Sequence, residues 1–258
     1  MAPDSTRNPR RGIYLLPNLL TTAALFAGFY SIVAAVDGNF QVAGASIFVA
    51  MLMDGMDGRV ARMTNTSTEF GKEYDSLSDM VSFGVAPAIV VYQWGVARLT
   101  EWHITWGRLG WLVAFLFAVA AALRLARFNT LAATADKKFF VGLPSPSAAG
   151  VVASFVWVSA KYELTGLGAL VLAFLVTALA GAMMVSRLRY YSFKDINLTG
   201  RVSFTYLMIV PLVFMLISVD PPLVLCMLFG SFALSGPALW YWRRRSSRGL
   251  TVKESGDA

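Results

Sequence analysis

The sequence predicts an all-α protein, a polytopic membrane helix bundle of about eight transmembrane helices with both termini in the cytoplasm. Three observations support this fold class. The 258 residues are 57% hydrophobic and only 14% charged, whereas about a quarter of the residues in a typical soluble domain are charged. The apolar residues form long continuous runs, as spanning helices require, rather than short alternating strands. The basic residues lie mainly in the gaps between these runs.

Eight apolar runs approach the length of about 20 residues that a helix needs to cross a bilayer. They are residues 17–36, 40–62, 73–97, 109–132, 144–160, 167–186, 203–219 and 222–242. The third run contains aspartates and Pro87, and the fifth begins at Pro144, so hydropathy alone undervalues both. We therefore expect a basic N-terminal segment (1–16), a membrane domain (17–219), a last membrane helix (220–242) and a basic tail (243–258).

The distribution of positive charge predicts the orientation. When the N-terminus is placed in the cytoplasm, all but three of the 22 lysine and arginine residues fall on the cytoplasmic side. The exceptions are Arg98, Arg108 and Lys161. Cytoplasmic loops of membrane proteins carry such an excess of basic residues. We interpret the net charge of +7 as a topology signal next to lipid head groups. The sequence thus predicts a multi-pass protein of the cell (inner) membrane, with no nucleic acid partner.

Four aspartates lie at the ends of two predicted membrane helices, and they are the first candidates for chemistry. Asp54 and Asp57 are three residues apart, and Asp75 and Asp79 are four apart, so each pair shares a helix face. A carboxylate at the centre of a membrane helix costs about 2.5–3.5 kcal/mol on insertion scales, and such residues normally face a polar cavity. Oxygen ligands without Cys or His favour Mg²⁺, Mn²⁺ or Ca²⁺ over zinc. These residues predict a divalent metal site.

The neighbours of the aspartates suggest the substrate class. Arg62 can hold a phosphate in a bidentate fork, and a metal pair next to an arginine is suited to phosphoryl chemistry on a diphosphate. Gly58 and Ala61 keep the first helix slim on nearly the same side. Asp54 lies about 21 Å along its helix from Phe40, at ~1.5 Å per residue. In an apolar core ~30 Å thick, this places the site in the cytoplasmic half, facing the cytoplasm.

Residues 54–79 read D-x-x-D-G-x-x-A-R-x8-G-x-x-x-D-x-x-x-D, which resembles the signature of the CDP-alcohol phosphatidyltransferase family at every fixed position. The resemblance implies that two helices present the aspartates to a pair of metal ions and that a CDP-linked lipid binds through its diphosphate. The implied metal ligands are Asp54, Asp57, Asp75 and Asp79, of which Asp79 is also the catalytic proton acceptor. The implied contacts to CDP-diacylglycerol are Asn18, Thr21, Gly58, Ala61, Arg62, Thr68 and Gly71.

Four further stretches, residues 76–87, 123–129, 142–146 and 187–194, are similar to the integral-membrane phosphatidylserine synthases of bacteria and archaea. This likeness implies transfer of the phosphatidyl group of CDP-diacylglycerol to the hydroxyl of L-serine, with release of CMP. It also implies two Mg²⁺ or Mn²⁺ ions and a homodimer. The serine carboxylate needs a cation, and the candidate residues at this site are Arg124, Arg127, Asn129, Ser145, Arg187 and Arg189.

A positioned base must take the proton of the serine hydroxyl during attack, and Asp79 is the candidate. Cys226 lies in the last predicted helix and His103 on the outer side, so the chain offers no nucleophile for a covalent intermediate and direct attack is expected. Two alternatives remain. The acceptor alcohol could be glycerol 3-phosphate or inositol phosphate, although a dianionic acceptor should need a more cationic pocket. A cation channel or carrier would also place aspartates in the membrane, but nearer to its middle.

Overall fold

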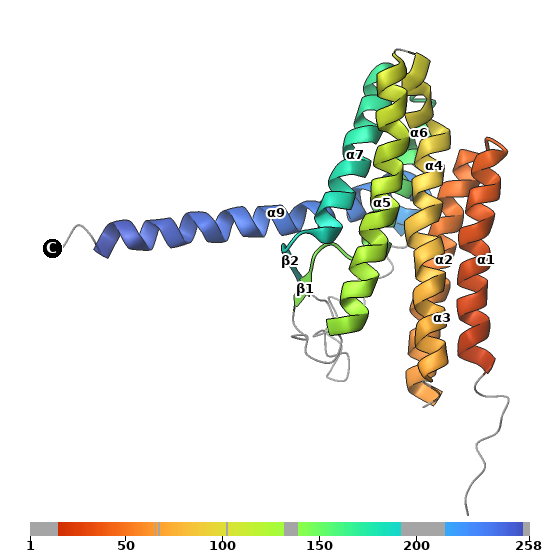
Figure 1. Cartoon of the computed structure of the whole chain (residues 1–258), viewed down its shortest axis with the longest axis horizontal. Helices are drawn as coiled ribbons and strands as arrows, with labels where there is room; N and C mark the ends of the chain where they lie inside the picture. The colour runs from red at the N-terminus through yellow and green to blue at the C-terminus, as the bar shows by residue number, and fades with distance from the viewer. Residues whose placement is uncertain are drawn as a thin grey trace, which may run out of the picture.

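The computed structural model describes residues 15–64, 66, 68–101, 103–131, 139–191 and 215–254. Its helices form a bundle (Figure 1). They are α1 (Leu15–Val36), α2 (Phe40–Thr64), α3 (Glu69–Asp79), the π-helix η2 (Met80–Val85), α4 (Ala86–Trp94), the 3₁₀ helix η3 (Val96–Glu101), α5 (Ile104–Leu131), α6 (Ser145–Lys161), α7 (Leu167–Val185) and α9 (Pro221–Glu254). Two short strands, β1 (Phe139–Val141) and β2 (Arg189–Tyr191), complete the described part.

The chain is a multi-pass membrane protein. Among the described residues, four helical segments are long and apolar enough to cross a membrane: Leu16–Val36, Ile104–Thr130, Leu167–Val185 and Pro221–Trp242. The predicted spans 40–62, 73–97 and 144–160 are helical over most of their length, but they contain charged residues or are too short to meet the same standard. Residues 203–214 lie outside the described residues. The count of eight spans therefore stays a prediction.

Close helix packing places α3 and η2 against α1. A side chain at Gly28 would put its Cβ atom 2.4 Å from the Ser82 hydroxyl oxygen, so only glycine allows α1 and η2 to approach this closely. Two serine hydroxyls donate hydrogen bonds across the same interface, from Ser82 to the carbonyl of Ala24 and from Ser78 to the carbonyl of Thr21, both at 3.2 Å. Small residues at helix contacts are typical of membrane bundles. This packing sets the position of α3, which carries half of the predicted motif.

The third predicted helix is not one continuous α-helix, and Pro87 explains the difference. Proline has no backbone N–H, and in an α-helix its ring would clash with the carbonyl four residues before it. The chain widens into a π-helix over Met80–Val85, where the N–H of Ala86 bonds to the carbonyl of Val81, five residues back. Helix α4 then ends at Trp94, and a 3₁₀ helix follows. The prediction of a single helix over 73–97 was wrong in this respect.

The protein is predominantly helical, but the all-α prediction missed a two-stranded antiparallel sheet. Phe140 of β1 pairs with Tyr190 of β2. The turn after β1 requires glycine, because Gly142 has a φ of +83° and a Cβ atom there would lie 2.3 Å from the Met184 carbonyl oxygen. Tyr190 is fully buried, and its hydroxyl donates to the carbonyl of Ala233 at 3.1 Å. The sheet thereby connects the start of α6 and the end of α7 to α9.

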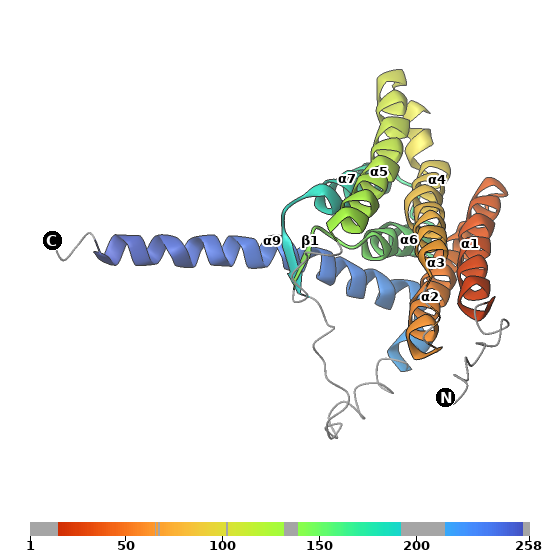
Figure 2. The ribbon, with the colours of Figure 1, turned by 60° about the horizontal axis from the view of Figure 1, so that its bottom comes forward.

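Helix α9 runs across the direction of the other helices, and its C-terminal half extends away from the bundle in both views (Figure 1, Figure 2). It contains Pro237 and continues to Glu254. The predicted boundary between the last membrane helix and the basic tail, at residue 242, therefore falls inside one helix.

Candidate metal and diphosphate site

Three of the four predicted aspartates converge where α2 faces α3. Asp54, Asp57 and Asp75 each offer a carboxylate oxygen, and these oxygens all lie within 4.8 Å of one another. Asp57 is 5% exposed, and the other two are half-buried. Asp79, one helical turn after Asp75, contacts the side chain of Asp54. The i,i+3 and i,i+4 spacings predicted one shared face for each pair, and the packing of α3 against α1 brings the two faces together.

One carboxyl oxygen of Asp75 lacks a partner. Its Oδ1 atom is buried and accepts no hydrogen bond from the described residues, although more than about 90% of buried polar groups in proteins have one. Within the described residues, no lysine or arginine forms an ion pair with Asp54, Asp57 or Asp75. Like charges this close repel one another unless a cation lies between them. The cluster therefore fits a divalent metal ion of the oxygen-ligated class.

Helix α1 orients one of the carboxylates. The hydroxyl of Thr21 donates a hydrogen bond of 2.6 Å to Oδ2 of Asp57, and Thr21 is itself buried. The sequence analysis assigned Thr21 to CDP-diacylglycerol. In the structure its hydroxyl is engaged with Asp57, which is the geometry of a residue that orients a metal ligand.

The connector between α2 and α3 forms the rim of the site. Thr68 is the N-cap of α3, and its Oγ1 accepts a hydrogen bond of 3.0 Å from the backbone N–H of Gly71. A Cβ atom on Gly71 would lie 3.1 Å from Thr68 Oγ1 and 3.4 Å from Oδ1 of Asn18. Three predicted CDP contacts, which are separated by up to 53 residues in the sequence, are therefore neighbours in the structure.

Arg62 lies next to the glycine of the motif. It is exposed in the last turn of α2, and its Nη1 atom is the nearest group to a Cβ placed on Gly58, at 3.8 Å. Outside the backbone of α2 itself, no other atom of the described residues lies within 4 Å of that Cβ. Ala61 is half-buried on the same helix. Gly58 and the guanidinium of Arg62 therefore lie side by side at the end of α2.

Arg124 of α5 is a predicted serine ligand that interacts with one of the four aspartates. Its Nη1 donates a hydrogen bond of 2.8 Å to the hydroxyl of Ser145, which is fully buried at the start of α6. Its guanidinium also interacts electrostatically with Asp79. The Nε atom of Arg124 is buried and has no hydrogen bond partner in the described part of the chain. The guanidinium of Arg124 is therefore positioned by Ser145, while its Nε remains able to donate a hydrogen bond.

The other predicted serine ligands are placed differently. Both terminal nitrogens of Arg127 donate to backbone carbonyls, those of Val141 and Val185. Asn129 donates to the Ser76 hydroxyl at 3.0 Å. Arg187 is exposed after α7, and the side chain of Arg189 lies outside the described residues.

The sequence analysis missed several polar residues that hold α3 in place. Tyr74 and Thr22 share a hydrogen bond of 2.9 Å between their hydroxyls, Ser76 accepts from Asn129, and Ser78 donates to the carbonyl of Thr21. A polar helix face with residues four apart, Tyr74 and Ser78, was the signal that could have indicated them.

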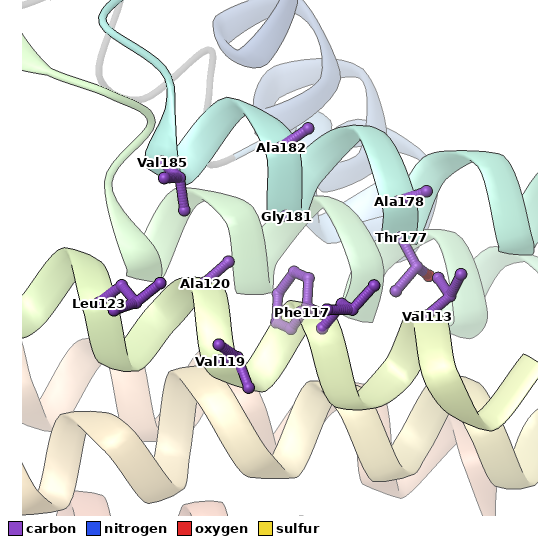
Figure 3. A pocket seen from close by; sticks show the side chains of 11 residues that line it. Val113, Phe117, Val119, Ala120, Leu123, Thr177, Ala178, Gly181, Ala182 and Val185 are labelled. Atoms are coloured by element: carbon purple, nitrogen blue, oxygen red, sulfur yellow. The ribbon is translucent and has the colours of Figure 1, made fainter.

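A second depression, between α5 and α7, has a different character (Figure 3). It has a volume of about 290 Å³. Its lining residues are Val113, Leu116, Phe117, Val119, Ala120, Leu123, Thr177, Ala178, Gly181, Ala182 and Val185. The hydroxyl of Thr177 is satisfied by the carbonyl of Ala173 at 2.7 Å. This groove is apolar and offers no group for phosphoryl chemistry.

Comparisons with known proteins identify the family and the fold. The family described as CDP-alcohol phosphatidyltransferase matches residues 14–188. A CDP-diacylglycerol–serine O-phosphatidyltransferase of Helicobacter pylori is 37% identical over 234 residues, which cover 90% of this chain and 93% of the relative. An archaetidylserine synthase of Methanothermobacter thermautotrophicus is 37% identical over 177 residues, covering 68% of this chain and 69% of the relative. The crystal structure of Mycobacterium tuberculosis phosphatidylinositol phosphate synthase with CDP-DAG bound has a TM-score of 0.50 and 18% identity, covers 67% of this chain and 82% of that chain, and shares the fold.

Proposed function

Because the chain belongs to the CDP-alcohol phosphatidyltransferase family, we propose that it transfers the phosphatidyl group of CDP-diacylglycerol to the hydroxyl of L-serine, giving phosphatidylserine and CMP. The convergence of Asp54, Asp57 and Asp75 within 4.8 Å, in the spacing of the family motif, carries the proposal of phosphoryl chemistry. Serine as the acceptor is supported by the relatives, since the one from Helicobacter pylori is named for serine and matches over 90% of this chain.

Two Mg²⁺ or Mn²⁺ ions would be held by Asp54, Asp57 and Asp75, with Asp79 as the fourth ligand. The buried, unpartnered Oδ1 of Asp75 supports this assignment. When bound, the ions supply electrophilic polarisation of the phosphorus and neutralise the developing charge on the leaving oxygen. The hydrogen bond from Thr21 keeps the Asp57 carboxylate oriented for this role.

The diphosphate of CDP-diacylglycerol would bind over Gly58, where the surface is open, with the Arg62 guanidinium as its bidentate partner. Thr68, Gly71 and Asn18 form the adjoining rim, which is the position for the rest of the CDP group. Arg62 lies in the last turn of α2, so the nucleotide would enter from the end of the bundle where α2 ends and α3 begins.

Arg124 is the residue we assign to the serine carboxylate. Its buried Nε has no partner among the described residues and can donate to a ligand, while its Nη1 donates to the hydroxyl of Ser145. The electrostatic interaction of the Arg124 guanidinium with Asp79, the proposed base, supports this assignment. Asp79 takes the hydroxyl proton as the serine oxygen bonds to the lipid-side phosphorus, and the bond from that phosphorus to the CMP oxygen breaks. No covalent enzyme intermediate is needed.

We further propose eight membrane spans in the inner membrane, both termini and the active site in the cytoplasm, and a homodimer. The charge asymmetry supports the orientation, since only Arg98, Arg108 and Lys161 among the lysines and arginines fall on the outer side. Labelling of single introduced cysteines in a Cys226→Ser background, with a reagent that does not cross membranes, tests the orientation. Labelling near Arg59 in intact cells would contradict it.

The decisive experiment for the function is an acceptor assay. Purified protein is incubated with CDP-diacylglycerol, Mg²⁺ or Mn²⁺, and one of serine, glycerol 3-phosphate or inositol phosphate, and CMP release is measured. Serine alone should support rapid release. Release with another alcohol but not with serine would replace the acceptor while keeping the family chemistry. Metal-ion transport in sealed vesicles, with no CMP release from any acceptor, would favour the channel or carrier alternative.

A further inference from the structure

A polar cleft lies at the end of the bundle opposite the aspartates. It has a volume of about 580 Å³ and lies where the α1–α2 turn, the ends of α4 and α6, and η3 meet. Phe40, which lines the cleft, precedes Asp54 by 14 residues of helix α2, or about 21 Å. The polar and charged residues that line the cleft include Asn39, Gln41, Gln93, Arg98, Ser159 and Glu163.

Ser159 supplies the first sign of a missing ligand. It lines the cleft and is 1% exposed, and its hydroxyl has no hydrogen bond partner among the described residues. Other serines of the bundle donate to backbone carbonyls, as Ser154 does to Val151 in the same helix. A buried hydroxyl without a partner is unusual and calls for a group from outside the chain.

Glu163 supplies the second sign of a missing ligand. It has a φ of 53°, and it is the one non-glycine residue with positive φ among the described residues. It follows the C-terminus of α6, where the N–H of Leu164 bonds to the carbonyl of Ser159 at 2.8 Å, and this position usually carries glycine. A glutamate here is backbone-strained. Its carboxylate is exposed and has no ion-pair partner in the described part of the chain.

A cation and two helix ends complete the cleft. Arg98 contacts Glu101 through Nε at 3.4 Å, a contact that leaves its two terminal nitrogens for a ligand. Phe40 and Gln41, the first two residues of α2, line the cleft, and a helix N-terminus favours an anion, whereas the C-terminal end of α6 next to Glu163 favours a cation. The cleft therefore offers separate sites for one negative and one positive group.

We propose that this cleft binds the zwitterionic head group of a phospholipid, a phosphate ester that carries an ammonium group. The phosphate contacts Arg98 and the N-terminus of α2, and the ammonium contacts Glu163 and the C-terminus of α6. The exposed apolar side chains of Leu164 and Leu167 adjoin the cleft in sequence and give the acyl chains a surface in the bilayer. The site is on the opposite membrane surface from the aspartates and is independent of the transfer reaction.

Lipid binding to the full-length protein in detergent tests the proposal. After delipidation, the protein is titrated with phosphatidylethanolamine and with phosphatidylglycerol, and bound lipid is measured by native mass spectrometry. Arg98→Ala should weaken binding of both lipids. Glu163→Gly should weaken only phosphatidylethanolamine binding, by about tenfold, the effect typical of one charge-assisted contact. Soluble phosphoethanolamine is the competitor that identifies the source: full competition indicates a free phosphoester, and weak competition indicates the lipid.

Glu163→Gly separates binding from folding, because glycine adopts positive φ without strain. Its Tm should equal or exceed that of the wild type while lipid binding falls. Glu101→Gln, which removes the partner of Arg98 but leaves the cleft charges, is the matched control and should bind both lipids normally. Serine-dependent CMP release should persist in all three variants. Unchanged phosphatidylethanolamine affinity in both Arg98→Ala and Glu163→Gly would overturn the proposal.

Discussion

Asp75 lies in α3 and Asp220 directly precedes α9, and the surroundings of these two aspartates are opposite. Asp220 is surrounded by donors: Lys161 Nζ lies 3.0 Å away, the Tyr162 hydroxyl donates to it, and the N–H of Leu223 donates at 3.3 Å. Asp75 faces other carboxylates, and its Oδ1 has no partner. The contacts of Asp220 connect the end of α6 to the start of α9. Asp75 has no such contacts, and its surroundings are suited to a cation from outside the chain.

The comparison gives a criterion for distinguishing structural from binding carboxylates in a membrane protein. A carboxylate near the membrane must have partners. Where the protein supplies them, as around Asp220, the residue stabilises the fold. Where the protein instead places three carboxylate oxygens within 4.8 Å of one another, as at Asp75, their mutual repulsion is relieved by a bound cation. The following experiments test whether the two aspartates differ in this way.

The largest effect is expected at the aspartate cluster. Asp57→Asn or Asp75→Asn should abolish serine-dependent CMP release, because a neutral amide binds a divalent cation poorly. The folded helical protein should persist in detergent. Asp220→Asn is the matched control and should retain kcat. If Asp75→Asn kept more than about a tenth of the wild-type rate, an effect of less than ~1.4 kcal/mol on the barrier, the metal-ligand assignment would be wrong.

A smaller loss is expected when a carboxylate of the site is moved rather than removed. Asp79→Glu keeps the charge but displaces the oxygen atoms by about one methylene. We expect normal binding of CDP-diacylglycerol and a kcat at least ~100-fold lower, since ~1 Å of misplacement can have this effect. Binding and kcat are measured on the same preparation. A near-normal kcat would assign the proton to a different acceptor.

The next largest effect is expected on the binding of the acceptor, serine, and not on the metal site. Arg124→Ala should raise the KM for serine by roughly 10- to 150-fold, the equivalent of a lost charge-assisted hydrogen bond of about 1.5–3 kcal/mol, with a smaller change in the KM for CDP-diacylglycerol. Arg127→Ala is the comparison, because its guanidinium is engaged with backbone carbonyls, and its effect should fall on stability. Normal serine saturation in Arg124→Ala would place the carboxylate elsewhere.

The smallest effect is expected at Asp220. Hydrogen bonds from Tyr162 and the nearby Lys161 lower the pKa of Asp220 below its usual value of 3.8. A lowered pKa stabilises the fold above that value, and the stabilisation is lost as the pH falls through the lowered pKa. Asp220→Asn should therefore reduce Tm slightly at neutral pH, and the difference from the wild type should shrink below pH 3.8. A Tm difference that is constant with pH would show that charge is not the cause.

The sequence predicted those parts of the molecule that depend on local pattern. The apolar runs predicted α1, α5 and α7 closely, and the motif spacing predicted that Asp54, Asp57 and Asp75 would share one site. The comparisons confirmed the family. Each of these signals is a periodicity or a spacing within one or two helices.

The missed features depend on contacts between distant segments. The strands β1 and β2 are three residues each and pair across about 50 residues. They are too short to contain a run of alternating apolar and polar residues from which strands are predicted. The engagement of Thr21 with Asp57, and of Arg127 with the carbonyls of Val141 and Val185, depends on how the helices pack. Charge and motif identified these side chains as polar and important, but they could not show which partner each one takes.

Metal binding by the aspartate cluster is the central claim, and Mn²⁺ titration followed by electron paramagnetic resonance tests it most directly. Wild-type protein, Asp75→Asn and Asp220→Asn are treated with EDTA, dialysed, and titrated with Mn²⁺, and CMP release is followed in the same samples. The account predicts that wild type and Asp220→Asn bind Mn²⁺ and regain transfer together, while Asp75→Asn does neither. Equal Mn²⁺ binding by all three proteins, or full CMP release in EDTA, would contradict it.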